Sequence, residues 1–125
     1  MSRKLTDHII PGKVVCNEVI VEDEPGDGGA CHVYQILGPV TDEGRYGVKM
    51  SFQNGPINEN GNGANGIHHE DLLSILIDRM RGFQSGDYAC RENAIALTNL
   101  EEALMWLQKR TRDRMARGVE GTHQR

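Results

Sequence analysis

The feature that most constrains the fold is a row of leucines in the C-terminal half of the chain. They recur at intervals of three, four and three residues: Leu97, Leu100, Leu104 and Leu107. This spacing places them on one face of an α-helix, here named the seam. The seam predicts a helix over residues 88–117, which Gly118 ends. At 1.5 Å per residue, such a helix is roughly 45 Å long.

A shorter amphipathic segment precedes this helix. Its apolar stripe is wide and consists of Leu72, Leu73, Ile75, Leu76, Ile77 and Met80. It predicts a helix over residues 69–81, with Glu70 and Asp71 in the first turn, where negative charge is favourable. The two helices form a hairpin over residues 69–117. Since the first helix is too short to cover the second, we expect part of the seam to pack on another chain, which predicts a homo-oligomer.

The N-terminal half carries patterns that are typical of strands. Residues 13–23 and 31–37 are rich in β-branched and alternating apolar side chains, and residues 45–53 alternate throughout. One face of this last stretch carries Tyr46, Val48, Met50 and Phe52. The alternation predicts a strand with one buried side. Residues 1–12 are polar and include a Pro-Gly stop, so we expect them to be loosely ordered.

Residues 54–66 are dominated by Gly, Pro and Asn, which predicts a loop. The patterns together predict an α+β protein that forms one domain over residues 1–125. A small antiparallel sheet at residues 13–53 is followed by the loop and then by the hairpin at residues 69–117, whose second helix is long.

Charge is unevenly distributed along the chain. The formal net charge is −4, yet the segment from residue 108 to the end carries six basic and two acidic side chains. A nonspecific nucleic-acid binder is usually basic as a whole. Positive charge at one helix end instead favours a compact anion, so we expect no specific nucleic-acid partner.

Several classes of protein are disfavoured by the sequence. The three cysteines have no CxxC spacing, which argues against a disulfide framework or a zinc site and favours a reducing cytosol. We expect no signal peptide, no membrane association and no cofactor. His68, His69 and Glu70 lack the HExxH pattern of a metal site, and a helix N-terminus explains them better.

Arginines form the strongest candidate site. Arg110, Arg114 and Arg117 lie at i, i+4 and i+7, so they share one broad helix face. Arg114 continues the seam, where another leucine is expected, and a buried charge needs a partner. Guanidinium groups match phosphate oxygens in pairs. The alternative is that these charges complement the helix dipole.

Two further residues are ambiguous. Phe83, in the connection between the helices, is either a stacking surface for a nucleobase or a hydrophobic plug that closes the turn. Asn93 lies on the seam, where it either fixes the helix register or faces a ligand.

The hairpin segment resembles two phage counter-defence families, the Thoeris anti-defence proteins of the first type and the second anti-CBASS proteins. The shared motifs are Arg91-Glu-Asn-Ala94, Ala96-Leu-Thr98 and Leu100-Glu-Glu-Ala-Leu-Met-Trp-Leu107. A longer set is similar to the Thoeris type specifically: Phe52-Gln-Asn-Gly-Pro56, Asn65-Gly66, Asp78-Arg79, Gly82-Phe-Gln84, Ala89-Cys-Arg-Glu-Asn93 and Arg117-Gly-Val-Glu-Gly-Thr-His123.

The resemblance implies a protein that is not an enzyme but a sponge in the host cytoplasm. Such proteins sequester glycocyclic ADP-ribose made by TIR-domain sensors, and some members bind cyclic di- or trinucleotides. The family fold is a small sheet followed by two helices, assembled as homodimers and often as homohexamers.

The resemblance also implies roles for individual residues. Phe83 and Asn93 would sandwich the adenine, and Arg110 and Arg114 would hold the phosphates. Gln84 and Asp87 are polar candidates near the base. The family takes a further basic residue from the loop before the first helix, and residues 58–60 contain neither Lys nor Arg.

Helix geometry refines this transfer. Asn93 and Arg114 are 21 positions apart on one helix, roughly 32 Å, which is longer than a cyclic ADP-ribose isomer. The site is therefore expected between subunits, with each end supplied by a different chain. Three rival functions remain open: a sponge for cyclic oligonucleotides only, a nucleotide hydrolase that uses His68, His69 and Glu70, and a small structural or nucleic-acid-binding phage protein.

Overall fold

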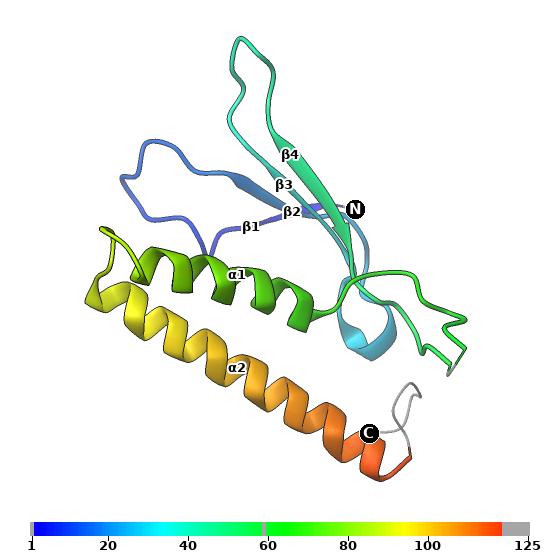
Figure 1. Ribbon diagram of the computed structural model, residues 1–125. Helices are drawn as coiled ribbons and strands as arrows, with labels where there is room; N and C mark the ends of the chain where they lie inside the picture. The colour runs from blue at the N-terminus through cyan, green and yellow to red at the C-terminus, as the bar shows by residue number, and fades with distance from the viewer. Residues whose placement is uncertain (1, 59, 119–125) are drawn as a thin grey trace. The chain divides into compact units, whose positions relative to one another are not determined.

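The computed structural model describes residues 2–58 and 60–118. Four strands precede two helices, in the order β1, β2, β3, β4, α1 and α2, which confirms the predicted α+β fold (Figure 1). The chain divides into two compact units. The sheet unit contains the residues up to Gly55 together with Gly63–Ile67, and the helical unit contains Pro56–Asn62 and the chain from His68 onward. That these units form one domain stays a prediction.

The sheet is a four-stranded antiparallel meander in which sequence neighbours are also spatial neighbours. Its strands are β1 (Arg3–Leu5), β2 (Glu18–Val21), β3 (Val33–Leu37) and β4 (Gly47–Ser51). The expectation that residues 1–12 are loosely ordered is wrong for β1, whose Leu5 pairs with Val19 of β2. Three residues are too few to show an alternating pattern, which is why the sequence did not reveal this strand.

The predicted burial of one side of β4 is also wrong in part. Tyr46, just before the strand, is 84% exposed and Val48 is 42% exposed, whereas Met50 and Phe52 are partly buried. The strand lies at an edge of the sheet, where a side chain has a neighbouring strand on one side only. Phe52 packs edge-on against Tyr34 of β3, with ring centroids 5.5 Å apart.

The carboxylate of Asp23 holds together the two ends of the connection between β2 and β3. Asp23 accepts hydrogen bonds from the backbone N–H of His32, at 2.9 and 3.1 Å, and from that of Val33, at 3.0 Å. These donors, Val33 foremost, stabilise the charged form and hold the pKa of Asp23 below its ordinary value of 3.8, although desolvation opposes them. Asp23 therefore fixes the start of β3 against the end of β2.

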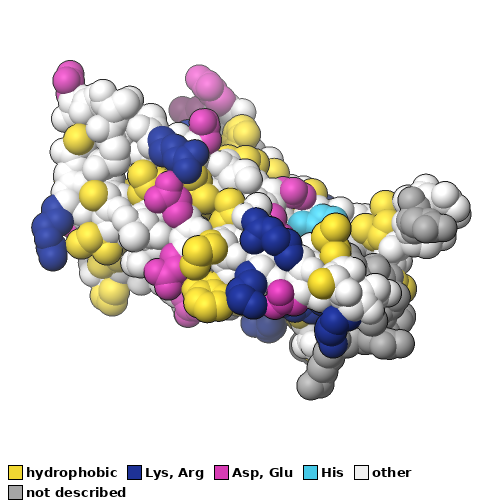
Figure 2. Space-filling view, turned by 60° about the horizontal axis from the view of Figure 1, so that its bottom comes forward, with side chains coloured by type: hydrophobic (Ala, Val, Ile, Leu, Met, Phe, Trp, Pro, Cys, Tyr) yellow, Lys and Arg dark blue, Asp and Glu magenta, His cyan; other side chains and the backbone are white. Residues whose placement is uncertain are grey.

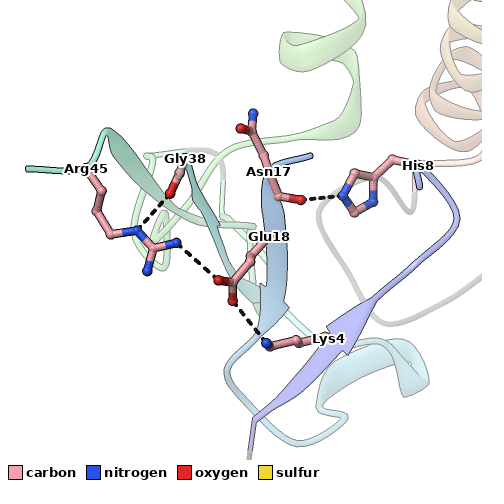
Figure 3. Close-up of polar contacts among 6 residues, drawn as sticks. All are labelled: Lys4, His8, Asn17, Glu18, Gly38 and Arg45. Atoms are coloured by element: carbon pink, nitrogen blue, oxygen red, sulfur yellow. Dashed lines mark hydrogen bonds and ion pairs between the residues drawn. The ribbon is translucent and has the colours of Figure 1, made fainter. Parts of the chain in front are cut away.

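Glu18 of β2 links its neighbours across the sheet surface (Figure 3). Arg45 donates to Glu18 at 3.1 Å and also donates, through Nε, to the carbonyl of Gly38 at 2.8 Å. Lys4 of β1 forms an ion pair with the other carboxylate oxygen at 3.2 Å. Hydrogen bonds from Arg45 and Lys4 lower the pKa of Glu18. The two contacts to Glu18 are exposed, so each contributes little to stability.

The helical unit contains α1 (His69–Gln84) and α2 (Arg91–Ala116), which pack against each other. Helix α1 continues one turn beyond the predicted end, through Gly82, because a single glycine weakens a helix without ending it. Helix α2 begins later than predicted, since the Sγ of Cys90 accepts the backbone N–H of Asn93 at 3.4 Å and caps its first turn.

Burial along α2 confirms the seam. Partly buried positions recur at its three- and four-residue spacing, at Asn93, Leu97, Leu100, Leu104, Leu107 and Thr111, and the series ends at the buried Arg114. Helix α1 has 16 residues and α2 has 26, so α2 is longer by about 15 Å. Ile75 and Leu76 of the predicted α1 stripe are exposed, at 57% and 46%.

In the described part of the chain, neither helix combines the length and the apolar composition that a membrane span requires.

We expect Asp23→Asn to lower the midpoint of thermal unfolding at pH 7, because the side-chain amide offers one neutral acceptor oxygen in place of the two charged oxygens that accept the N–H groups of His32 and Val33. Since the folded-state pKa of Asp23 is depressed, its contribution is present above the ordinary value of 3.8 and is lost as pH falls through the lower folded-state pKa. The difference between variant and wild type should therefore shrink in acid. The exposed Asp42→Asn is the matched control, and an equal effect of both variants at pH 7 would contradict the assignment.

Candidate functional site

The structure places the predicted site residues in two groups at opposite ends of the hairpin. Phe83, Gln84, Asp87 and Asn93 surround the turn between α1 and α2, here named the aromatic end. Arg110 and Arg114 lie in the last turns of α2, here named the arginine end, together with Arg117. Asn93 and Arg110 are 17 positions apart on one continuous helix, roughly 26 Å. One chain therefore does not bring the two ends together.

Phe83 is held at the aromatic end with part of its ring open. Tyr88 contacts it edge-on, with ring centroids 6.4 Å apart, and the guanidinium of Arg79 lies 5.5 Å from the ring centroid. The Phe83 side chain remains 40% exposed. The ring is packed by neighbours and still partly accessible, which fits both a stacking surface and a plug that closes the turn. Sequence reasoning missed Arg79, although its position four residues before Phe83 on a helix was a usable signal.

Gln84 stabilises the turn between α1 and α2 through hydrogen bonds of its side chain. Its side-chain amide donates to the carbonyl of Cys90 at 3.1 Å, and its side-chain carbonyl accepts the N–H of Cys90 at 3.0 Å. Both ends of the side chain are thereby engaged with the backbone that starts α2. A direct ligand contact by Gln84 stays a prediction, as does one by Asp87, which lies exposed in the turn.

Asn93 lies in the first turn of α2, on the seam. Its side-chain amide donates to the carbonyl of Tyr88 at 3.5 Å, and its side chain is partly buried. Since Tyr88 also contacts Phe83, these residues form one connected cluster around the turn. The position fits both readings of Asn93, a register residue and a ligand contact, so the choice between them stays open.

The arginine end is hollowed. An open cavity of about 750 Å³ is lined by Trp106, Lys109, Arg110, Asp113, Arg114 and Arg117. Lys109 forms an ion pair with Asp113 at 2.7 Å. Arg114 is only 6% exposed, whereas Arg110 and Arg117 are exposed. Several guanidinium groups around one cavity suit an anion with more than one phosphate.

Figure 2 shows Lys and Arg side chains spread over this face of the molecule, with acidic and apolar side chains between them. Sequence reasoning did not single out Trp106, although it lies one turn before Arg110 on the same helix. Dipole complementation remains a simpler account of the charges alone, but it does not explain an aromatic side chain among them.

A smaller groove of about 420 Å³ runs between the helices. It is lined by Ser74, Ile77, Asp78, Arg81, Glu101, Leu104, Met105 and Gln108. Arg81 of α1 donates to Glu101 of α2 at 2.9 Å. This exposed ion pair links the two helices at the groove and points to a structural role.

His68 and His69 lie at the start of α1, His68 as the N-cap and His69 as the first residue of the helix. The N–H of His68 donates to the carboxylate of Asp71 at 2.9 Å, in a reciprocal cap of α1. Within residues 2–58 and 60–118, no group of three or more His, Cys, Asp or Glu side chains could hold a metal ion.

Comparisons with known proteins place these features in a family. The family model described as Acb2/Tad1, hairpin domain, matches residues 46–112, a span that includes Phe83, Asn93 and Arg110. The protein named Thoeris anti-defense 1 from Bacillus phage SBSphiJ7 is 55% identical over 76 residues, which are 61% of this chain and 52% of that protein. The chain thus spans about half the length of the curated relative that it matches.

We expect Gln84→Ala to reduce the free energy of unfolding by about 1 kcal/mol, the usual net contribution of such hydrogen bonds. The two bonds to Cys90 hold the turn that carries Phe83, so the loss should appear in chemical denaturation monitored by circular dichroism. Gln108→Ala, on the exposed surface of α2, is the matched control. A stability equal to that of wild type would show that the turn does not depend on this amide.

Proposed function

We propose that this protein, which belongs to the Acb2/Tad1 hairpin family, is a phage counter-defence protein that blocks Thoeris immunity. It acts as a sponge in the host cytoplasm that binds a cyclic ADP-ribose-type signal, glycocyclic ADP-ribose, made by TIR-domain sensors. Stoichiometric binding lowers the free signal and needs no catalytic group. The similarity to the protein named Thoeris anti-defense 1 supports Thoeris immunity as the pathway that is blocked.

The observation that carries the proposal is the chemical division of the hairpin. The aromatic end offers an accessible Phe83 ring beside the Asn93 amide, and the arginine end offers several guanidinium groups around a cavity. A base and a pyrophosphate require these two kinds of surface. A cyclic ADP-ribose isomer carries both groups within one small ring.

The separation of the two ends requires a second subunit. One molecule smaller than the roughly 26 Å between Asn93 and Arg110 cannot contact both from one chain. The proposed pocket is therefore assembled from the aromatic end of one protomer and the arginine end of its partner. Exposed apolar side chains on the hairpin, such as Ile75 and Met105, provide a surface on which such protomers can associate as a homodimer or a homohexamer.

The second candidate is capture of cyclic di- or trinucleotides. The same two surfaces favour it, because neither a stacking aromatic side chain nor an arginine cluster discriminates between cyclic ligands of different sizes. Competition in solution separates the two candidates. A cyclic trinucleotide that displaces glycocyclic ADP-ribose shares its site, whereas simultaneous binding indicates a separate one.

We expect Phe83→Ala and Arg110→Ala each to weaken the binding of purified glycocyclic ADP-ribose by at least roughly tenfold in calorimetry, since each removes a stacking or charge-assisted contact. Arg112→Ala, an equal charge change at an exposed position outside the cavity, should bind as wild type does. Recovery of intact ligand after denaturation should be complete. No binding by wild type, or consumption of ligand with turnover, would refute the sponge.

The shared pocket predicts complementation between two inactive variants. In a mixed dimer of Phe83→Ala and Arg110→Ala chains, one pocket carries both substitutions and the other carries neither. Co-refolded mixtures should therefore regain binding at one wild-type-like pocket per mixed dimer, measured by calorimetric stoichiometry. If each chain forms its own complete site, no mixture of the two variants will recover affinity.

A further inference from the structure

Trp106 is the only tryptophan of the chain, and it lies in the arginine end. It is 58% exposed, so a large part of its surface is accessible to a ligand. The residue lines the cavity of the arginine end, and the function proposed above gives it no role. Its position beside the arginines therefore requires an explanation of its own.

Helix geometry places the indole and the arginines on one surface. Trp106, Arg110, Asp113 and Arg117 follow one another at intervals of four, three and four residues, so they form a row along α2. Trp106 and Arg110 are separated by roughly 6 Å along the helix axis. This spacing is comparable with the separation between a phosphate and the sugar or base that it carries.

The charges in this row favour the binding of an anion next to the indole. Asp113 lies between the arginines, but Lys109 holds its carboxylate at 2.7 Å. Arg110 is exposed and lines the same cavity as Trp106. The cavity thus combines a flat apolar wall with guanidinium groups, the combination that nucleotide sites use to hold a ring and its phosphates.

We propose that Trp106 is a specificity-determining residue that packs against the nucleoside portion adjoining the bound phosphates. It makes the arginine end a site for nucleotides and not for bare phosphate or pyrophosphate. The inference deepens the proposed function and rests on it, because it takes the arginine end as the phosphate-binding half of the pocket. It adds a ring contact at that half, independent of the stacking on Phe83.

The test compares three probes that share phosphate chemistry: inorganic pyrophosphate, ribose 5-phosphate and ADP. Affinities are measured by calorimetry on the full chain, and the fluorescence of Trp106 serves as a local reporter, since the chain has no other tryptophan. ADP should bind roughly tenfold more tightly than pyrophosphate, within the range of one stacking contact. ADP should also quench the fluorescence, and pyrophosphate should not. Ribose 5-phosphate separates the sugar from the base as the group that covers the indole.

Substitutions test whether Trp106 contacts the nucleoside portion of the ligand. Trp106→Ala should reduce the preference for ADP over pyrophosphate while leaving pyrophosphate binding unchanged, and Trp106→Phe should restore most of that preference. Met115→Ala is the matched control, because it removes an exposed apolar side chain of the same helix that does not line the cavity. Repeating the comparison in the Phe83→Ala background removes the second stacking surface, and the dependence on Trp106 should persist there.

Three results would overturn the inference. An unchanged preference for ADP in Trp106→Ala shows that the indole does not contact the ligand. An equal loss of ADP and pyrophosphate binding shows a general structural role. A lower oligomeric mass with an unchanged preference shows that a second copy covers the residue. The proposed function is judged separately, by binding of glycocyclic ADP-ribose to the wild type, so failure of one is distinguishable from failure of the other.

Discussion

The structure of the hairpin depends on a mismatch in length between two packed helices. Helix α2 extends its seam over 26 residues, and α1, with 16, pairs with only part of it. Apolar packing supplies most of the stability of such helices, so the portion of α2 beyond α1 needs another source of burial or another function. In this chain that portion carries the exposed Arg110 and the buried Arg114, so the candidate anion-binding residues lie where the packing between α1 and α2 ends.

Periodicity predicted the helices well because it is a repeated signal. The leucine spacing located the seam of α2, and burial at Asn93 and Arg114 follows the same repeat. Individual boundaries depend on single contacts that no pattern contains, such as the Cys90 thiol that caps α2. The three residues of β1 are too few to show an alternation, and the exposure of Tyr46 depends on the strand order, which places β4 at an edge.

Residue types predicted the chemistry of the candidate site, but not the support around it. Arg110 was recognisable from its charge and helical spacing, and Phe83 from its place in a turn. The contact of Arg79 with the Phe83 ring and the engagement of Gln84 with Cys90 depend on side-chain directions, which are set only when the hairpin closes. Sequence resemblance assigned Gln84 to the ligand, and the structure adds a bracing role that positions the residues beside it.

Arg114 shows how folding and binding are joined in this helix. It occupies a seam position where leucine would bury apolar area, and its 6% exposure confirms that the position is shielded. A guanidinium there costs desolvation, which hydrogen bonds and a counter-charge must offset. A doubly charged ligand such as a pyrophosphate would add further counter-charge at this position. The same shielding leaves the Arg114 side chain few rotamers, and preorganisation of this kind lowers the entropy lost on binding.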